Sequence, residues 1–310
     1  MTKDLKILVL GIGNGGNSAI EGMANSYDNI EFWALNTDKQ ILKQYNIPNK
    51  LLLGENLAMG LGSGGDVALG RKCALESKEE IEKILFGADM VYLVSCLSGG
   101  TGTGAVSIIA EIAKRMGILT VSVVTIPFAF EGRHALEKAT LGLKVLKKYT
   151  DAYIKIKNND ILKVIPQNCS MGNGFKIINE IVHNAITSIN DILFTENIGT
   201  PSTNIDFADI RRIFNKAGEI SITVAEAEGE NKTDKVIEIL KNALSELSPI
   251  QAKRLILNVT GDENITLHNV YEIAQALKDK ISDSAEILFG CVINEELKDK
   301  IKVTLLWSPN

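Results

Sequence analysis

Residues 98–104 read Ser-Gly-Gly-Thr-Gly-Thr-Gly, a run of residue types that can bind phosphate. The glycines leave backbone N–H groups uncovered and allow positive φ angles. Thr101 and Thr103 add hydroxyl groups for phosphate oxygens or for the water shell of a metal ion. An apolar run at 90–94 precedes this glycine–threonine loop, and helical spacing at 105–116 follows it. The loop is therefore predicted to join a buried strand to a helix N-terminus, which also attracts anions.

The alternative interpretation of this loop is a tight turn that only packs a helix on a sheet. Four glycines and two threonines within residues 98–104 favour a polyphosphate site over such a turn. The loop does not fit the P-loop pattern, because no Gly-Lys-Ser/Thr follows it.

Asp206 and Asp209 form a second group that could do chemistry. Their spacing of three residues places both carboxylates on one face of a helix start. Asn204 is expected to cap that helix, with Asp206 near its first turn. Two carboxylates can orient and polarise a water molecule. The competing structural interpretation is that these residues only cap the helix.

The first 40 residues allow a different class of function. A predicted strand at 6–10 is followed by Gly11, Gly13 and Gly16 in G-x-G-x-x-G spacing, and then by a predicted helix at about 18–26. Asp38 follows the next predicted strand, where a dinucleotide fold places its ribose ligand. Taken alone, this unit predicts an NAD-dependent oxidoreductase, although a single G-x-G-x-x-G match is weak evidence.

Residues 98–104 resemble the phosphate-binding signature of the tubulin/FtsZ superfamily, and residues 204–209 resemble the catalytic loop of bacterial FtsZ. In that family this loop enters the nucleotide site of the next subunit. Residues 60–66, here the second glycine loop, resemble the family loop that closes over the terminal phosphate, although they could be only a mobile connector. Residues 125–133 resemble the family segment whose carboxylate, here Glu131, holds the ribose.

The resemblance covers essentially the whole chain and implies an α/β fold. It predicts a Rossmann-like parallel-sheet GTP-binding domain at 1–170, a central core helix at 171–198, and a smaller C-terminal α/β domain at 199–310. Helical spacing independently predicts one long helix at 172–194 and another at 67–86. The implied function is a cytoplasmic GTPase that assembles head to tail into filaments and hydrolyses GTP between subunits.

The resemblance also assigns residues to the site. Asp206 and Asp209 would act on the neighbouring subunit, with Asn204 positioning their loop. Phe175 would stack on the base, Asn179 would read its edge, and Mg²⁺ would bind through phosphates and water without a direct protein ligand. The residues implied to bind GTP or GDP are Gly13, Asn14, Gly15, Gly16, Asn17, Asn36, Asp38, Gly64, Gly65, Ser98, Gly99, Gly100, Thr101, Gly102, Thr103, Gly104, Pro127, Glu131, Arg133, Asn158, Phe175 and Asn179.

The chain departs from the family pattern at three positions. FtsZ proteins place a third basic residue where this chain has Ala135, and they have glycine at the positions of Ser98 and Cys96. These departures keep open a GTP-binding filament protein that hydrolyses GTP slowly; a plasmid- or phage-type filament protein is a further alternative. A GTP-binding regulator that does not polymerise also stays open, and the oxidoreductase is a remote alternative.

Composition limits the partners. The chain has 310 residues, 45% of them hydrophobic, and a net charge of −5, which gives no basic surface for nucleic acid. Its apolar runs are strand-sized and no secretory signal is present, so no membrane partner is expected. The four cysteines and three histidines are dispersed, which predicts free thiols and no zinc site. The expected partner is another copy of the chain, together with filament-binding adaptors.

The sequence ends at Asn310 without the flexible tail that division-type FtsZ proteins carry. Either a tail has been removed, or the protein positions plasmid or phage DNA. Filament architecture and the identity of adaptors are not predicted.

Overall fold

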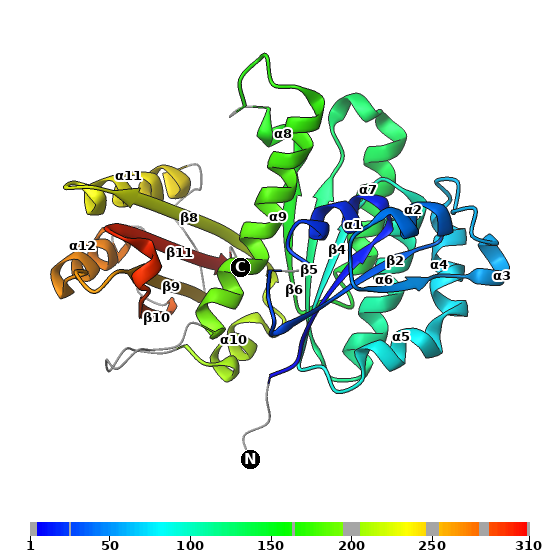
Figure 1. Ribbon diagram of the computed structural model, residues 1–310, viewed down its shortest axis with the longest axis horizontal. Coiled ribbons are helices and arrows are strands. Elements are labelled where there is room, and N and C mark those ends of the chain that lie inside the picture. Colours follow the sequence, from blue (N-terminus) through cyan, green and yellow to red (C-terminus); the bar gives the residue numbers. More distant parts are fainter. Residues whose placement is uncertain are drawn as a thin grey trace. The chain divides into compact units, whose positions relative to one another are not determined.

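The computed structural model describes residues 5–24, 26–162, 165–194, 205–245, 254–278 and 285–308. The chain divides into two compact units, Met1–His183 and Asn184–Asn310, with the division inside α9 (Met171–Phe194). This 24-residue helix (Figure 1) confirms the long helix predicted at 172–194. None of the described helices is both long and apolar enough to cross a membrane.

The first unit is built on a parallel sheet in the order β3-β2-β1-β4-β5-β6 (Figure 1). Its central strands are continuous apolar runs, and all six residues of β1 are buried. Burial on both faces requires helices on both sides of the sheet, as parallel sheets usually have. The strands are β1 (Ile7–Ile12), β2 (Ile30–Asn36), β3 (Asn49–Leu52), β4 (Met90–Cys96), β5 (Leu119–Ile126) and β6 (Ala152–Lys157).

The helices of this unit connect successive strands, as parallel pairing demands. One face of the sheet, including Leu8, Leu10 and Ile12, shares a buried core with residues of α4 to α7. The helices before α9 are α1 (Gly13–Glu21), α2 (Lys39–Gln44), α3 (Glu55–Ala58), α4 (Val67–Glu76), α5 (Lys78–Leu85), α6 (Gly100–Arg115), η1 (Ala129–Glu131), α7 (Arg133–Leu146) and α8 (Asn158–Ile161).

Two helices begin earlier than the sequence predicts. α1 begins at Gly13 rather than near residue 18, and α6 begins at Gly100 rather than at residue 105. The glycines expected to form loops instead form the first helical turns, which pack directly on neighbouring backbone. A Cβ added to Gly16 would lie 2.2 Å from the Val94 carbonyl oxygen. Apolar periodicity cannot reveal turns built from glycine, so the predicted starts were late.

α4 and α6 also approach each other through glycine. A Cβ on Gly70 would lie 2.4 Å from the Gly100 carbonyl oxygen, and one on Gly104 would lie 2.3 Å from the Val67 carbonyl oxygen. Real Cβ atoms do not come this close to backbone oxygens. The two helices are therefore in backbone contact along a glycine seam formed by residues 70, 100 and 104.

The single helix predicted at 67–86 is wrong, because the structure breaks it into α4 and α5 at Ser77. The Ser77 hydroxyl accepts a hydrogen bond from the Gly54 N–H at 3.0 Å. The backbone of Ser77 departs from helical geometry, with ψ at 23°, so this residue ends α4 and precedes α5.

The second unit contains a four-stranded sheet in the order β10-β9-β11-β8, in which β11 is antiparallel to both neighbours. The apolar faces of α11 and α12 pack on this sheet and form its core. The elements are α10 (Phe207–Phe214), β7 (Gly218–Glu219), β8 (Ser221–Glu228), α11 (Lys232–Ser245), β9 (Arg254–Gly261), α12 (Leu267–Lys278), β10 (Glu286–Ile293), η2 (Glu295–Leu297) and β11 (Lys300–Ser308).

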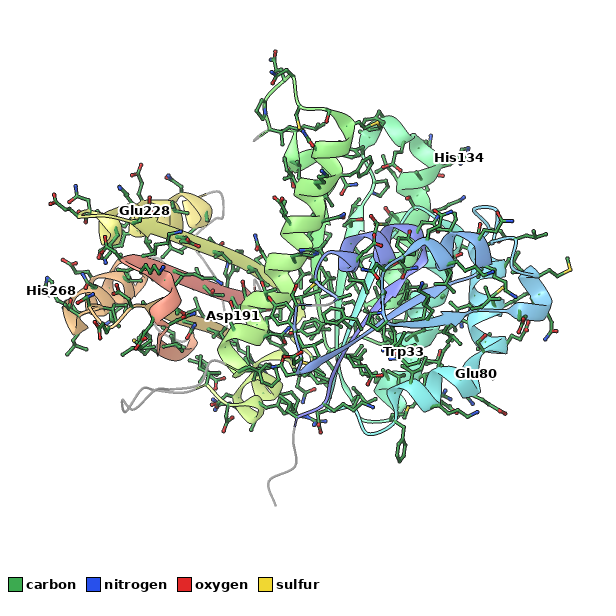
Figure 2. All side chains as sticks on the ribbon, viewed as in Figure 1. Trp33, Glu80, His134, Asp191, Glu228 and His268 are labelled. Atoms are coloured by element: carbon green, nitrogen blue, oxygen red, sulfur yellow. The ribbon has the colours of Figure 1, made fainter. Side chains whose placement is uncertain are left out.

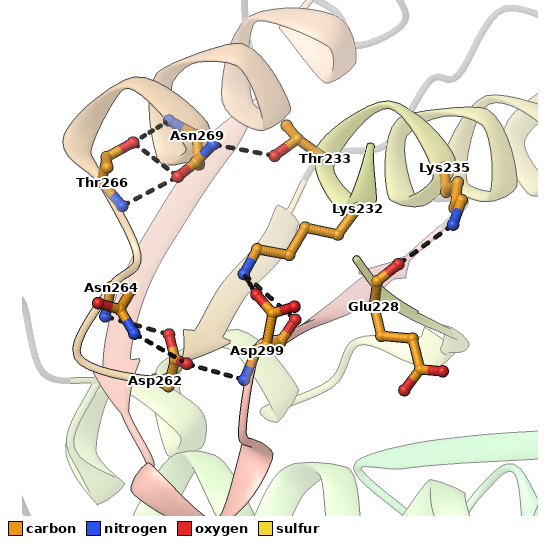
Figure 3. A network of polar contacts seen from close by, with 9 residues as sticks. All are labelled: Glu228, Lys232, Thr233, Lys235, Asp262, Asn264, Thr266, Asn269 and Asp299. Carbon is orange, nitrogen blue, oxygen red and sulfur yellow. Dashed lines mark hydrogen bonds and ion pairs between the residues drawn. The ribbon is translucent and has the colours of Figure 1, made fainter. Parts of the chain in front are cut away.

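A polar network ties the loops at one end of this sheet together (Figure 3). The buried Asp262 carboxylate accepts hydrogen bonds from the Asp299 N–H at 2.8 Å and the Asn264 N–H at 3.1 Å. Lys232 pairs with Asp299 at 2.6 Å. Lys298 and Asp299 have φ angles of 37° and 67°, which non-glycine residues adopt at a cost. The network holds this backbone conformation in place.

Candidate functional site

A cavity of about 700 Å³ opens at the carboxyl ends of the first-unit strands, where ligands bind in open parallel sheets. Every described residue that lines it belongs to the first unit. Of the residues predicted to bind nucleotide, the cavity brings together Gly13, Asn14, Gly15, Asn36, Asp38, Gly64, Gly65, Ser98, Gly99, Gly100, Thr101, Gly102, Pro127, Glu131, Asn158 and Phe175.

Three predicted residues have packing contacts instead of lining the cavity. Gly16 and Gly104 are the close backbone contacts of α1 and α6 described above. Thr103 is 2% exposed, on the buried side of α6. Glycine motifs therefore mix ligand contacts with packing contacts, which a sequence alone does not separate.

Three further predicted residues have their side chains engaged elsewhere. Asn17 is fully buried and donates to the Leu35 carbonyl at 3.2 Å. Asn179 donates to the Ser18 carbonyl at 3.2 Å and does not line the cavity. Arg133 pairs with Glu137 at 2.7 Å on the surface.

The N-terminus of α6 provides the anion-binding part of the cavity. Gly99 is its N-cap, in extended conformation and without a side-chain cap. The N–H groups of Gly100, Thr101 and Gly102 have no acceptor within the helix, as in the first turn of any α-helix. Together with the helix dipole, these donors suit phosphate oxygens.

The second glycine loop packs on this helix start. The Ser63 hydroxyl lies 3.0 Å from the Thr101 hydroxyl, which lies 2.6 Å from the Thr37 hydroxyl. A Cβ on Gly100 would lie 2.5 Å from Ser63 Oγ. Ser63 therefore connects the second glycine loop to the first turn of α6. Two contacts use two of the three hydroxyl hydrogens, so one is left for a ligand. Ser63 and Thr37 were missed because their role depends on loops that are distant in sequence.

Both carboxylates in the cavity wall also fix local backbone. Asp38 Oδ1 caps α2 by accepting from Gln40 and Ile41, and Glu131 Oε1 accepts from the Phe128 N–H at 2.8 Å. Each carboxylate has a second oxygen that can accept from a ligand hydroxyl.

Basic side chains are absent from the described residues that line the cavity. Arg133 and His134 begin α7, and their side chains are 89% and 99% exposed. Figure 2 shows His134 at the outer edge of its helix. Phosphate charge would therefore be balanced by backbone amides and by a cation from elsewhere.

Aromatic residues and a buried amide form another part of the wall. Phe128 stacks on Phe130 with centroids 4.8 Å apart and meets the edge of Phe175 at 6.0 Å. Phe130 and Phe175 are 65% and 45% exposed, so both can receive a planar ring. Within the described residues, the buried Oδ1 of Asn158 has no hydrogen-bond partner. It is ready to accept from a ligand. Phe130 was missed although its spacing from Phe128 indicated a shared aromatic surface.

The Cys96 thiol in the cavity wall is not activated, and neither is the Tyr45 phenol, which donates to the carbonyl of the lining residue Asn14. Burial raises the pKa of the Cys96 thiol, so it stays protonated at neutral pH. Desolvation, and then the Glu21 carboxylate, raise the pKa of Tyr45 to about 12. Neither the Cys96 thiol nor the Tyr45 phenol is therefore suited to act as a nucleophile at neutral pH. Among the described residues, no group of three or more His, Cys, Asp or Glu side chains could hold a metal ion.

The predicted catalytic carboxylates lie in the second unit. Asp206, not Asn204, is the N-cap of α10: its Oδ1 accepts from the Asp209 N–H at 2.9 Å, and Asp209 Oδ2 accepts in return. Asn204 lies outside the described residues. Arg212 bridges Asp209 at 3.2 Å and Glu286 at 3.0 Å, a contact that the sequence analysis did not identify.

Residues 6–166 match a family model described as Tubulin/FtsZ family, GTPase domain, and residues 218–308 match FtsZ family, C-terminal domain. The chain belongs to the tubulin/FtsZ family. The resemblance seen in the motifs is thereby confirmed, and the GTPase-domain match identifies a GTP hydrolase rather than an oxidoreductase.

Solved structures agree with this assignment. An empty FtsZ dimer from M. jannaschii is 32% identical, with a TM-score of 0.87 over 99% of this chain and 89% of that one. CetZ2 from Haloferax volcanii, solved as a GTPγS-bound protofilament, is 19% identical, with a TM-score of 0.79 over 98% and 92% of the two chains. GDP-bound monomeric CetZ1 from the same organism is 20% identical, with a TM-score of 0.83 over 99% and 94%. The two CetZ structures show the fold alone.

Proposed function

We propose that this chain binds GTP in the first-unit cavity, assembles head to tail into filaments, and hydrolyses GTP where two subunits meet. One observation carries the proposal: the described cavity wall comes entirely from the first unit, whereas Asp206 and Asp209 belong to the second unit and do not line it. A second copy would supply these carboxylates. Repeated head-to-tail contact that does not close by rotation produces a filament.

Assembly by relatives supports this reading. M. jannaschii FtsZ has been solved as a dimer, and Haloferax CetZ2 as a GTPγS-bound protofilament. We transfer self-association from those proteins to this one, since the match to the FtsZ dimer covers 99% of the chain.

The nucleotide fits the cavity as follows. Its phosphates meet the amides of Gly100, Thr101 and Gly102, and its base stacks on Phe175. Asn158 Oδ1 accepts from a sugar or base donor, and Glu131 accepts from the ribose hydroxyls. Mg²⁺ would be held by phosphates and water, as this ion keeps several waters.

Hydrolysis would proceed by direct attack of a positioned water molecule, without a covalent enzyme intermediate. Asp206 and Asp209 of one copy orient a water molecule toward the terminal phosphate of the next copy, and one of them can accept its proton. Phosphoryl transfer depends mainly on positioning and charge stabilisation, so no activated side-chain nucleophile is required. Mg²⁺ would neutralise charge that develops on the phosphate oxygens.

The first experiment measures phosphate release from GTP against protein concentration, with sedimentation of the same samples. Asp209→Asn keeps an oxygen that can preserve the cap of α10 but removes the charge. We expect wild type to show rising specific activity above a critical concentration. The variant should still sediment with GTP but hydrolyse it about 100-fold more slowly. Asp234→Asn, an exposed acid in the first turn of α11, is the matched control and should behave as wild type.

Flat specific activity that Asp209→Asn leaves unchanged would rule out action in trans. Polymers without turnover in wild type would instead support the slow-hydrolysing filament, which the lack of basic residues in the described cavity wall favours. We place either filament in the cytoplasm, in cell division or in positioning of plasmid or phage DNA, with filament-binding adaptors as further partners.

A further inference from the structure

A lysine on α7 donates a hydrogen bond to the backbone of the second glycine loop. Lys138 Nζ donates to the Gly65 carbonyl at 2.8 Å. This contact lies at a second cavity, of about 540 Å³, bounded by α4, α6 and α7. Gly64 and Gly65 line both this cavity and the nucleotide cavity. This glycine pair is therefore a thin wall with Lys138 on one side and the nucleotide cavity on the other.

The same loop is anchored on its nucleotide side by neutral groups. Ser63 Oγ contacts Thr101 Oγ1 at 3.0 Å, and the Asp66 N–H donates to the Ser63 carbonyl at 2.9 Å. Gly64 and Gly65 lie between these anchors, with φ angles of 56° and 78° that only glycine adopts easily. The Lys138 contact is the side-chain hydrogen bond that fixes this otherwise permissive pair.

Lys138 is also well placed electrostatically. No lysine or arginine belongs to the described wall of the nucleotide cavity, and Arg133 at the start of α7 is paired with Glu137 on the surface. The Lys138 ammonium is partly buried behind the wall, at a glycine that the cavity shares. A positive charge there is less screened than one in bulk water, and it attracts an anion across the loop.

We propose that Lys138 is a positioning residue that fixes the Gly64–Gly65 backbone against the terminal phosphate and thereby favours GTP over GDP. The inference rests on the proposed function, and it takes the terminal phosphate to lie beside Gly64 and Gly65, which line the same cavity as the first turn of α6. The alkyl stem and hydrogen bond would act through the loop, and the ammonium would partly replace the family's basic residue at the position of Ala135.

The test is equilibrium binding of GTPγS and of GDP, each with Mg²⁺, at protein concentrations where sedimentation shows no polymer. Lys138→Met keeps the length and apolar stem but removes the donor and the charge. We expect its Kd for GTPγS to rise about tenfold, equivalent to about 1.4 kcal/mol, while its Kd for GDP stays within about twofold. Lys138→Arg should recover most of the preference. Lys144→Met, at an exposed position on the same helix, should match wild type.

Equal loss of affinity for both nucleotides, or no change for either, would overturn the role of Lys138 while leaving the proposed function intact. If wild type itself binds neither nucleotide, the proposed function fails and this inference fails with it. Thermal unfolding of each variant identifies a folding defect, and the arginine variant decides the matter should the methionine variant be poorly folded.

Discussion

Asn158 is the residue of the described cavity wall that has a buried side-chain atom without a hydrogen-bond partner. Its side chain is 5% exposed, it lines the nucleotide cavity, and within the described residues its Oδ1 has no partner. A buried acceptor without a donor costs free energy in the protein without nucleotide. Binding of a sugar or base donor would recover that cost.

Asn158→Ala should therefore separate affinity from stability. We expect the free energy of unfolding without nucleotide to change by less than about 1 kcal/mol, because relief of the unpaired oxygen offsets lost packing. The Kd for GTP should rise about tenfold. Chemical denaturation and nucleotide titration measure the two quantities. A large loss of stability with unchanged affinity would assign Asn158 a purely structural role.

For individual residues, the sequence motifs predicted many of those that line the cavity, but not the hydrogen-bond partner of each side chain. Gly100 and Phe175 line the cavity as expected. Asn17 and Asn179 instead donate to the carbonyls of Leu35 and Ser18, because a polar side chain bonds to whichever backbone the tertiary fold brings near it.

Among the elements, α10 combines structure and proposed chemistry in one helical turn. Asp206 caps the helix and accepts from Asp209, while Arg212 holds Asp209 against Glu286. Both carboxylates are thus held by contacts within the second unit of the same chain.

Substitutions at Asp206 can separate the cap from catalysis. Asp206→Ala should destabilise the protein by about 1 kcal/mol through loss of the cap, whereas Asp206→Asn should stay close to wild type, since asparagine caps equally well. Both should lower polymer-dependent hydrolysis by at least about tenfold if the charge acts on the nucleotide. Thermal unfolding and phosphate release test this. Full activity in the asparagine variant would restrict Asp206 to a capping role.

Periodicity predicted the long helix α9, but it joined α4 and α5 into one helix and misplaced the starts of two others. α9 was predicted within one residue at its start because its apolar face repeats over 24 residues. The starts of α1 and α6 were missed because their first turns consist mainly of glycine and polar residues, which carry no apolar periodicity. The cap of α10 was assigned two residues too early for a related reason: several neighbouring polar residues can cap a helix equally well.

At the scale of the whole molecule, the two units differ in where their charged side chains lie. The described wall of the first-unit cavity has no basic side chain and offers backbone N–H donors to an anion. The second unit instead buries a carboxylate, that of Asp262, within its loop network. The Asp299 N–H bond, followed by the Asn264 bonds, lowers the pKa of Asp262 below its ordinary value.

This shift predicts a pH dependence of stability. A carboxyl with a depressed pKa in the folded state stabilises the protein above its unfolded pKa of about 3.9, and that contribution is lost as pH falls through the lower folded value. Asp262→Asn should therefore lower the unfolding temperature of the second unit at pH 7. The difference from wild type should shrink below about pH 4. Calorimetry at both pH values tests this, and a pH-independent difference would contradict the linkage.

The glycine seam between α4 and α6 limits how this chain can diverge. A methyl group at position 70, 100 or 104 would require two helices to separate, so neutral drift at one position cannot proceed without compensation at several others. Substitutions at Phe86, which is 77% exposed, meet no such barrier. Descendants of this sequence are therefore expected to vary first at such exposed positions, and to keep the seam for as long as they keep the nucleotide site.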